Sequence, residues 1–273
     1  MTVDDLGFIE GADLLNFDVS QAIREVFNTY GVKVSVSQKK KSLHKFGRNQ
    51  LTTNAATGST IMTLPAGQNH ETYVSTNAID TVSSSSTSDT EEILIEGHTI
   101  SGSDFTFVVQ TITLTGQTKA VLSTPLARVS RMYNNNGTDL VGSVYCYEDD
   151  TLTAGVPDTG TKVHATIRAG KNNTEKCATT LSSTDYWFVT EWGGSVLEKT
   201  AAFADVELEV APFGKVFRVL DALGVASGAT VEESFSPYLI VPANSDVRVV
   251  GVASAAGKQV AASIHGYLAT AIG

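Results

Sequence analysis

The sequence predicts an all-β protein, an antiparallel β-sandwich of jelly-roll type that follows an extended N-terminal arm and one short helix. Two observations indicate the sandwich. Apolar residues alternate with polar ones over short runs, as at Ile93 and Ile95 or at Val206, Leu208 and Val210. Turn signals separate such runs at near-regular spacing, which gives roughly ten short strands from residue 32 onward. We therefore expect the arm and helix in residues 1–31 and the sandwich in residues 32–273.

The N-terminal arm and the helix differ in their patterns. Residues 1–17 show no periodicity, and either they dock on a partner or they pack on their own domain. In residues 19–30 the apolar side chains fall at helical spacing and form one stripe. Asp18 and Gln21 are placed as a capping box, and Gly31 follows at the C-terminal cap. The apolar residues of the arm include Phe8, Leu14, Leu15 and Phe17.

A basic cluster follows a short predicted strand at residues 32–36. It comprises Lys39, Lys40, Lys41, Lys45 and Arg48. A solvated loop is the plainest interpretation, and a contact with an acidic protein surface is the sharper one. A nucleic-acid site ranks third, because only Phe46 is available to stack on a base and the chain has a net charge of −10.

The central stretch, residues 91–133, predicts strands that are separated by turns at Gly97, Gly102 and Gly116. Phe107 and Val109 are expected to face the core together with Phe105. The alternation slips at residues 110–111, where a bulge or a strand break is expected. The Ser-rich segment 83–89 resembles a linker in composition, but Ser and Thr are also common on the solvent face of strands, so we place no boundary there.

Two hairpins are predicted in the C-terminal part. A four-residue turn after residue 210 would pair Leu208 with Phe217 and Val206 with Val219. A second hairpin is expected around residues 255–258. Upstream of both, an aromatic cluster contains Tyr186, Trp187, Phe188 and Trp192. Core packing is the favoured role of this cluster, and a sugar-stacking platform is the functional alternative.

No catalytic or cofactor-binding signature appears in the sequence. The five histidines, His44, His70, His98, His164 and His265, are scattered singly and are expected on the surface or in turns. The acidic run at residues 148–150 lacks the ligand spacing of a calcium loop. Cys146 and Cys177 are expected as small buried side chains, with a disulfide the lesser alternative. The sequence predicts neither an enzyme nor a metal site, and neither a membrane span nor a signal peptide is recognised.

The order of the segments resembles that of head decoration (cement) proteins of tailed bacteriophages. The resemblance rests on residues 79–107, 111–138, 199–219 and 237–269. It implies a non-catalytic virion protein that is made in the host bacterial cytoplasm. It also implies a β-sandwich that binds the outside of an icosahedral head as a homotrimer, with the major capsid protein as its partner. By position, Phe8, Leu14, Leu15 and Phe17 of the arm and the basic cluster are the candidate contacts. A receptor- or glycan-binding module of a tail, fibre or cell surface is the alternative function, and a neck or tail-completion protein is a minor third.

Overall fold

The computed structural model describes residues 35–52, 57–65, 68–198 and 202–272. Within these ranges the regular elements are β-strands, apart from one 3-10 turn, η3 (Gly160–Lys162), so the predicted all-β class is confirmed there. The predicted arm and helix lie outside the described residues. No helix in the described part of the chain has the length and apolarity to cross a membrane.

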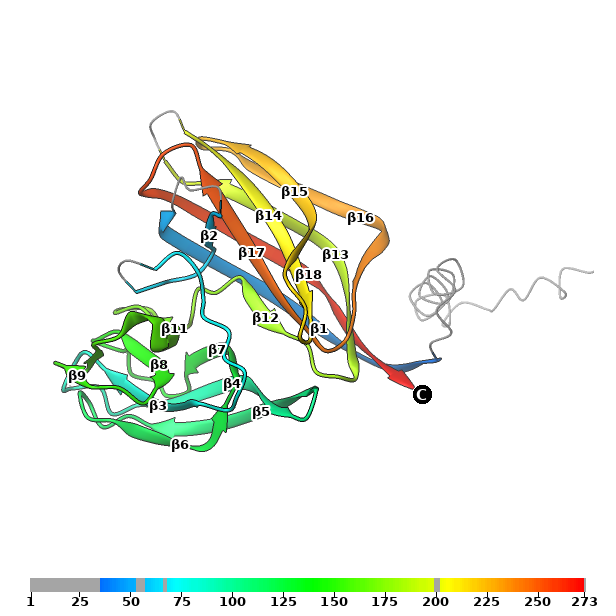
Figure 1. Cartoon of the computed structure of the whole chain (residues 1–273). Helices are drawn as coiled ribbons and strands as arrows, with labels where there is room; N and C mark the ends of the chain where they lie inside the picture. Colours follow the sequence, from blue (N-terminus) through cyan, green and yellow to red (C-terminus); the bar gives the residue numbers. More distant parts are fainter. Residues whose placement is uncertain (1–34, 53–56, 66–67, 199–201, 273) are drawn as a thin grey trace, which may run out of the picture.

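Eight strands form the larger of two sandwiches (Figure 1). One sheet contains, in order, β1 (Ser35–Thr52), β18 (Lys258–Ile272), β13 (Asp185–Val196) and β16 (Thr230–Val241). The other contains β12 (Ala178–Thr180), β17 (Ser245–Ala253), β14 (Phe203–Pro212) and β15 (Arg218–Ala226), and the short β2 (Ser59–Thr60) also pairs with β17. Numbered along the chain, these eight strands run 1-8-3-6 and 2-7-4-5 across the two sheets. This is the strand order of a jelly roll.

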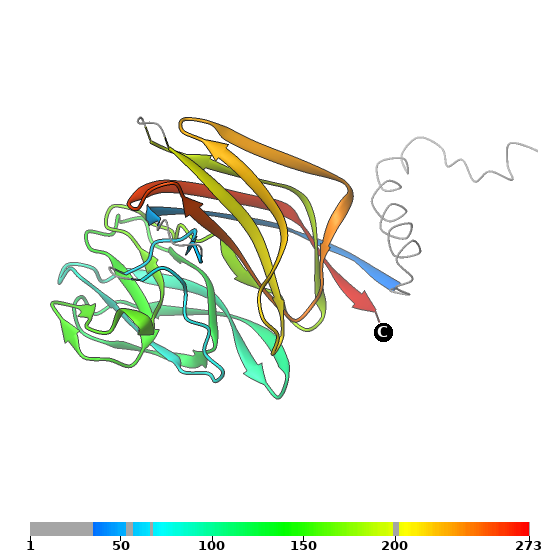
Figure 2. The ribbon, with the colours of Figure 1, turned by 45° about the horizontal axis from the view of Figure 1, so that its top comes forward.

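The second sandwich is formed by the chain between β2 and β12. One sheet has the order β11 (Val163–Ile167), β8 (Val144–Glu148), β3 (Ile79–Ser84), β6 (Ala120–Leu126). The other has the order β5 (Asp104–Thr113), β4 (Glu92–Ser101), β7 (Arg128–Asn134), and a small hairpin pairs β9 (Leu152–Thr153) with β10 (Val156–Pro157). Figure 2 shows this sandwich beside the jelly roll from a second direction.

Each sandwich has its own hydrophobic core. Trp187, Trp192 and Leu208 belong to the core of the jelly roll, whereas Ile93 and Met132 belong to that of the smaller sandwich. The sequence predicts one sandwich over residues 32–273, whereas the described part of that range contains two sandwich cores and a separate small cluster of Phe188 and Ala269. Apolar and polar residues alternate with the same period in the strands of both sandwiches, so periodicity alone does not separate the two. The division at residue 31 stays a prediction.

Strand β1 corrects the interpretation of the basic cluster as a loop. The strand extends from Ser35 to Thr52 and pairs with β18 over most of this length. It lies at the edge of its sheet, a position where lysines are favoured because they oppose further strand pairing. A run of cations in the sequence therefore marked an edge strand.

Strand β5 corrects the predicted break at residues 110–111. It pairs with β4 without interruption, and the alternation changes instead after Phe105. Phe107 is consequently 39% exposed, while the side-chain amide of Gln110 donates to the Thr124 carbonyl at 2.8 Å. Gly97 is not a turn residue either. It lies within β4 at the irregular pairing with β7, where a Cβ atom would lie 2.3 Å from the Arg128 carbonyl oxygen.

The first predicted C-terminal hairpin is present with a different register, and the second is not a hydrogen-bonded hairpin. In the first, Leu208 pairs with Asp221 and Val206 with Leu223, because β15 begins only at Arg218 and the ladder has a bulge after Leu208. In the second, β17 and β18 belong to opposite sheets of the jelly roll. The turn between them therefore crosses the sandwich, and it does not close a hydrogen-bonded hairpin.

Replacing Gly47 by Ala is expected to lower the free energy of unfolding by about 2–3 kcal/mol, because the added methyl overpacks β1. Its Cβ would lie 2.2 Å from the Ile61 carbonyl oxygen and 2.3 Å from the Cys177 nitrogen, and backbone atoms on both sides cannot move apart cheaply. Urea unfolding measures the change. The matched control is Gly224→Ala in β15, where a Cβ would meet nothing within 4 Å. Equal unfolding midpoints for the two variants would contradict the prediction.

Candidate functional site: the junction and cleft between the sandwiches

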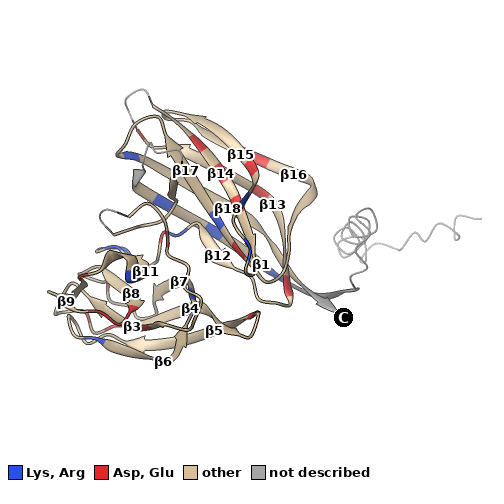
Figure 3. Ribbon diagram, in the orientation of Figure 1, with Lys and Arg blue, Asp and Glu red and all other residues tan. Residues whose placement is uncertain are grey.

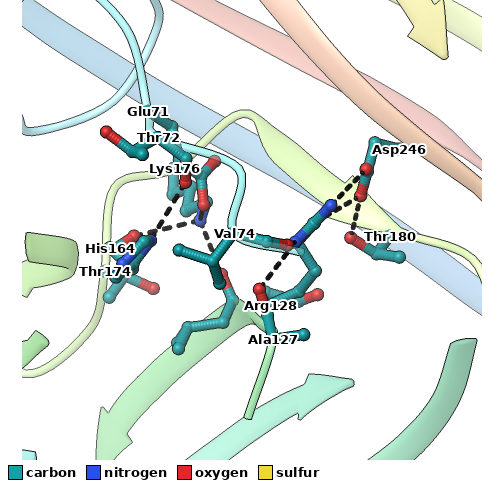
Figure 4. Close-up of polar contacts among 12 residues, drawn as sticks. Glu71, Thr72, Val74, Ala127, Arg128, His164, Thr174, Lys176, Thr180 and Asp246 are labelled. Carbon is teal, nitrogen blue, oxygen red and sulfur yellow. Dashed lines mark hydrogen bonds and ion pairs between the residues drawn. The ribbon is translucent and has the colours of Figure 1, made fainter. Parts of the chain in front are cut away.

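A buried ion pair joins the two sandwiches (Figure 4). Arg128 on β7 donates from Nε to Oδ1 of Asp246 on β17 and from Nη2 to Oδ2, both at 2.9 Å. Thr180 donates its hydroxyl to the same carboxylate at 2.6 Å. The guanidinium also donates to the carbonyls of Val74 and Ala127. Four of the five N–H donors of the guanidinium and both oxygens of the carboxylate therefore have partners, and such hydrogen bonding offsets the cost of burying an ion pair.

A second buried ion pair lies at the same junction. Lys176, just before β12, donates to Glu71 and to the carbonyls of Val129 at 2.6 Å and His164 at 3.1 Å. These three bonds use all the protons of the ammonium group. The first ion pair thus joins the smaller sandwich to β17 of the jelly roll, and the second joins it to the two segments that connect the sandwiches.

A cleft of about 400 Å³ lies beside this junction. Strands β1 and β18 of the jelly roll form one wall, and β4, β5 and β7 of the smaller sandwich form the other. Its charged lining includes Lys41, Lys45, Arg131, Glu96 and Asp185, besides the paired Lys176. Figure 3 shows the cations on β1, and acidic residues predominate on β13 to β16.

The predicted contact residues are not all brought together. The arm residues Phe8, Leu14, Leu15 and Phe17 lie outside the described residues. Lys39 and Lys40 lie on β1, and Lys41 on the same strand is exposed, with its Nζ 5.1 Å from the centre of the Phe107 ring. Lys45 is only 6% exposed and lines the cleft. Arg48 is half-buried and lines a separate hollow of about 190 Å³.

Lys45 is the unexpected member of this cluster. Its ammonium group donates to the Ser130 carbonyl at 2.5 Å, and no carboxylate among the described residues lies within ion-pair distance of it. Burial, together with the neighbouring Lys176 ammonium, lowers the Lys45 pKa to about 8. The local sequence did not indicate burial, because Lys45 shares β1 with the exposed Lys41.

Two histidines correct the prediction of surface or turn positions. His98 is 3% exposed and His164 is 1% exposed. Burial lowers the pKa of His98 to about 3, and the Arg128 guanidinium acts in the same direction. His44 and His265 face each other across β1 and β18 with ring centroids 4.0 Å apart. Single histidines in a sequence give no signal of such pairing, because the strands that carry them are far apart in the chain.

The aromatic cluster on β13 supports core packing. Trp187, Phe188 and Trp192 are fully buried, and the Trp192 indole donates to Asp221 at 2.9 Å. The two tryptophans that would form a sugar-stacking platform are thus inaccessible. Tyr186 is half-buried.

The acidic run and the cysteines also have structural partners. Glu148 contacts His164, Asp149 pairs with Lys119, and Asp150 pairs with Lys162. Within the described ranges, no group of three or more His, Cys, Asp or Glu side chains is placed to hold a metal ion. The cysteines are buried free thiols in different cores, as the preferred prediction had them, and burial raises the pKa of each to about 12.

Comparison with known proteins gives limited information. No family model matches the chain, and no curated protein sequence matches it. Among solved structures, it is similar to the infectious bursal disease virus Gt strain structure, with 15% identity, a TM-score of 0.22, and coverage of 87% of this chain and 73% of that chain. It is also similar to the structure of T=1 particles derived from the same virus, with 13% identity, a TM-score of 0.21, and coverage of 92% and 74%. TM-scores this low carry no argument about the function of this chain.

Proposed function

We propose that this chain is a non-catalytic structural protein of a virion, a decoration protein that binds the outer surface of an icosahedral phage head. The observation that carries the proposal is the jelly-roll strand order of the larger sandwich. Jelly rolls are the fold of many viral capsid domains and of lectins. The burial of Trp187 and Trp192 favours the capsid class over the sugar-binding class.

The clamped junction supports a mechanical role. Arg128 with Asp246 and Lys176 with Glu71 hold the two sandwiches together through buried contacts. A stiff body that binds assembled shells and not free subunits stabilises the assembled state by mass action. The major capsid protein is the proposed partner, and a homotrimer is the proposed oligomer. Both follow from the resemblance in segment order.

The copy number of the chain in purified particles tests this function. Quantitative mass spectrometry against the major capsid protein is expected to give hundreds of copies, in a simple ratio to the capsid protein. A handful of copies would contradict a head decoration role and favour the tail or neck. Absence from the particle would overturn the proposal as a whole.

Deletion of residues 1–17 is expected to weaken binding to heads that lack the chain while leaving the sandwiches folded. The reason is that an arm of apolar residues such as Phe8 and Phe17 would add contact area on a neighbouring subunit. Co-sedimentation with heads measures binding, and circular dichroism with thermal unfolding checks the fold. A control that replaces the four apolar candidates of the arm by Ser separates side-chain contacts from arm length. Undiminished binding by the deleted chain would count against the arm.

A further inference from the structure

We propose that the cleft between the two sandwiches binds a carboxylate, with Lys45 as its counter-ion. The site goes beyond the proposed virion role, since it requires neither a head nor a second copy of the chain. Three features of the cleft carry the inference: an unpaired buried cation, two buried polar atoms without partners, and an apolar wall.

The unpaired cation is Lys45. Its side chain is buried, and one proton of the ammonium group bonds to the Ser130 carbonyl. The contrast with Lys176 at the same junction is direct, because Lys176 has a carboxylate and two carbonyls as partners. A buried charge without a counter-ion is unfavourable. A ligand carboxylate would supply that counter-ion and accept the remaining protons.

The unpartnered polar atoms are Ser130 Oγ and His98 Nδ1. Both residues line the cleft, both are at most 5% exposed, and neither atom has a hydrogen-bond partner within the described structure. Buried polar atoms are nearly always paired, so each such atom calls for an explanation. The Ser130 hydroxyl can donate, and the His98 ring donates in the tautomer that carries its proton on Nδ1. Ser130 also provides the carbonyl that accepts the bond from Lys45, so the two residues are in direct contact.

The remaining lining indicates the rest of the ligand. The volume of about 400 Å³ is within the range of small-molecule sites and exceeds that of an isolated carboxylate. Leu43, Phe107, Leu181 and Leu268 supply apolar surface. The lining carries three positive side chains, Lys41, Lys45 and Arg131, and two negative ones, Glu96 and Asp185. Lys176 is neutralised by Glu71, so the net charge of the lining is +1. A single carboxylate attached to an apolar body fits this lining better than a multiply charged anion.

The charge state of Lys45 agrees with this assignment. Burial and the Lys176 ammonium lower its pKa to about 8, so it is largely protonated at pH 7 and unfavourably charged. A bound carboxylate would oppose both effects and raise the pKa. The free acid of a metabolite and the acidic side chain of a partner protein share this chemistry.

The test uses the full chain with sodium phenylacetate, sodium acetate and sodium phosphate at constant ionic strength set with sodium chloride. Calorimetric titration and the thermal midpoint report binding. Phenylacetate is expected to bind saturably and more tightly than acetate. The variants Lys45→Met and Ser130→Ala are each expected to weaken it, with Lys45→Met weakening it roughly tenfold or more. Lys119→Met is the control, because Lys119 lies in an exposed ion pair outside the cleft.

Several outcomes would overturn the site. These are the absence of saturable phenylacetate binding, equal binding by wild type and Lys45→Met, or phosphate binding as tight as that of phenylacetate. Ser130→Ala keeps the test valid if Lys45→Met fails to fold, since it removes only a hydroxyl. A capped Leu-Glu-Leu peptide amide distinguishes the two sources of the carboxylate. Tighter binding of the peptide than of phenylacetate assigns the site to a partner's acidic side chain, and the reverse assigns it to a free acid.

Discussion

Replacing Arg128 by Met is expected to lower the free energy of unfolding by about 3–5 kcal/mol, because it leaves Asp246 charged and buried without its guanidinium. Methionine preserves much of the apolar stem, but the contacts of the guanidinium with the Tyr73 and Phe105 rings are lost with the charge. The carbonyls of Val74 and Ala127 also lose their donor. Thr180 remains as a donor to the carboxylate, which keeps the loss within this range.

Urea unfolding followed by tryptophan fluorescence and circular dichroism measures this change. The matched control is Lys119→Met, which breaks the exposed pair with Asp149 and is expected to cost less than about 1 kcal/mol. The double variant Arg128→Met, Asp246→Leu is expected to recover part of the loss, because it removes the orphaned charge. Equal effects of Arg128→Met and Lys119→Met would show that the junction contributes no more than a surface ion pair.

Lowering the pH from about 6.5 towards 4 is expected to destabilise the protein through His98, by about 1.4 kcal/mol for each pH unit below roughly 6. The folded pKa of His98 is about 3, against an ordinary value of 6.5. Between these values the unfolded chain binds a proton that the folded chain does not. The unfolded state is therefore favoured as the pH falls, and the penalty is absent above about 6.5.

The variant His98→Gln isolates this contribution, because glutamine does not titrate while the carboxylates remain the same in both proteins. The difference between the stability–pH curves of wild type and variant is expected to widen steadily from pH 6.5 to pH 4. His70→Gln is the control, since His70 is only half-buried and its substitution is expected to change the slope less. Parallel curves for wild type and His98→Gln would contradict the assigned pKa.

Local patterns in the sequence predicted much of the fold. Alternating apolar residues such as Val206, Leu208 and Val210 are indeed buried, and Gly102 and Gly116 occupy turns with positive φ. These features depend on neighbours along the chain, so they are visible in the sequence. The outward position of Phe107 was not predicted, since the two faces of a β-strand differ only by one step of the same alternation.

The candidate site was predicted only in part. The sequence indicated a basic cluster that includes Lys41, Lys45 and Arg48. It could not show that Lys45 is buried in the cleft between the two sandwiches. Edge-strand lysines are ordinarily solvated, and only the packing of the smaller sandwich against β1 covers this one. His98 and Ser130 carried no motif at all.

The sequence by itself determined the strand class, the turns at Gly102 and Gly116 and the burial of Trp187 and Trp192, because each depends on side chains within a few residues of one another. The tertiary structure decided the number of cores, the register of β14 with β15, and the junction. Arg128 and Asp246 are 118 residues apart, and Lys176 and Glu71 are 105 apart. Such pairs form only when the smaller sandwich packs against the jelly roll, and no local pattern encodes which distant charges then meet.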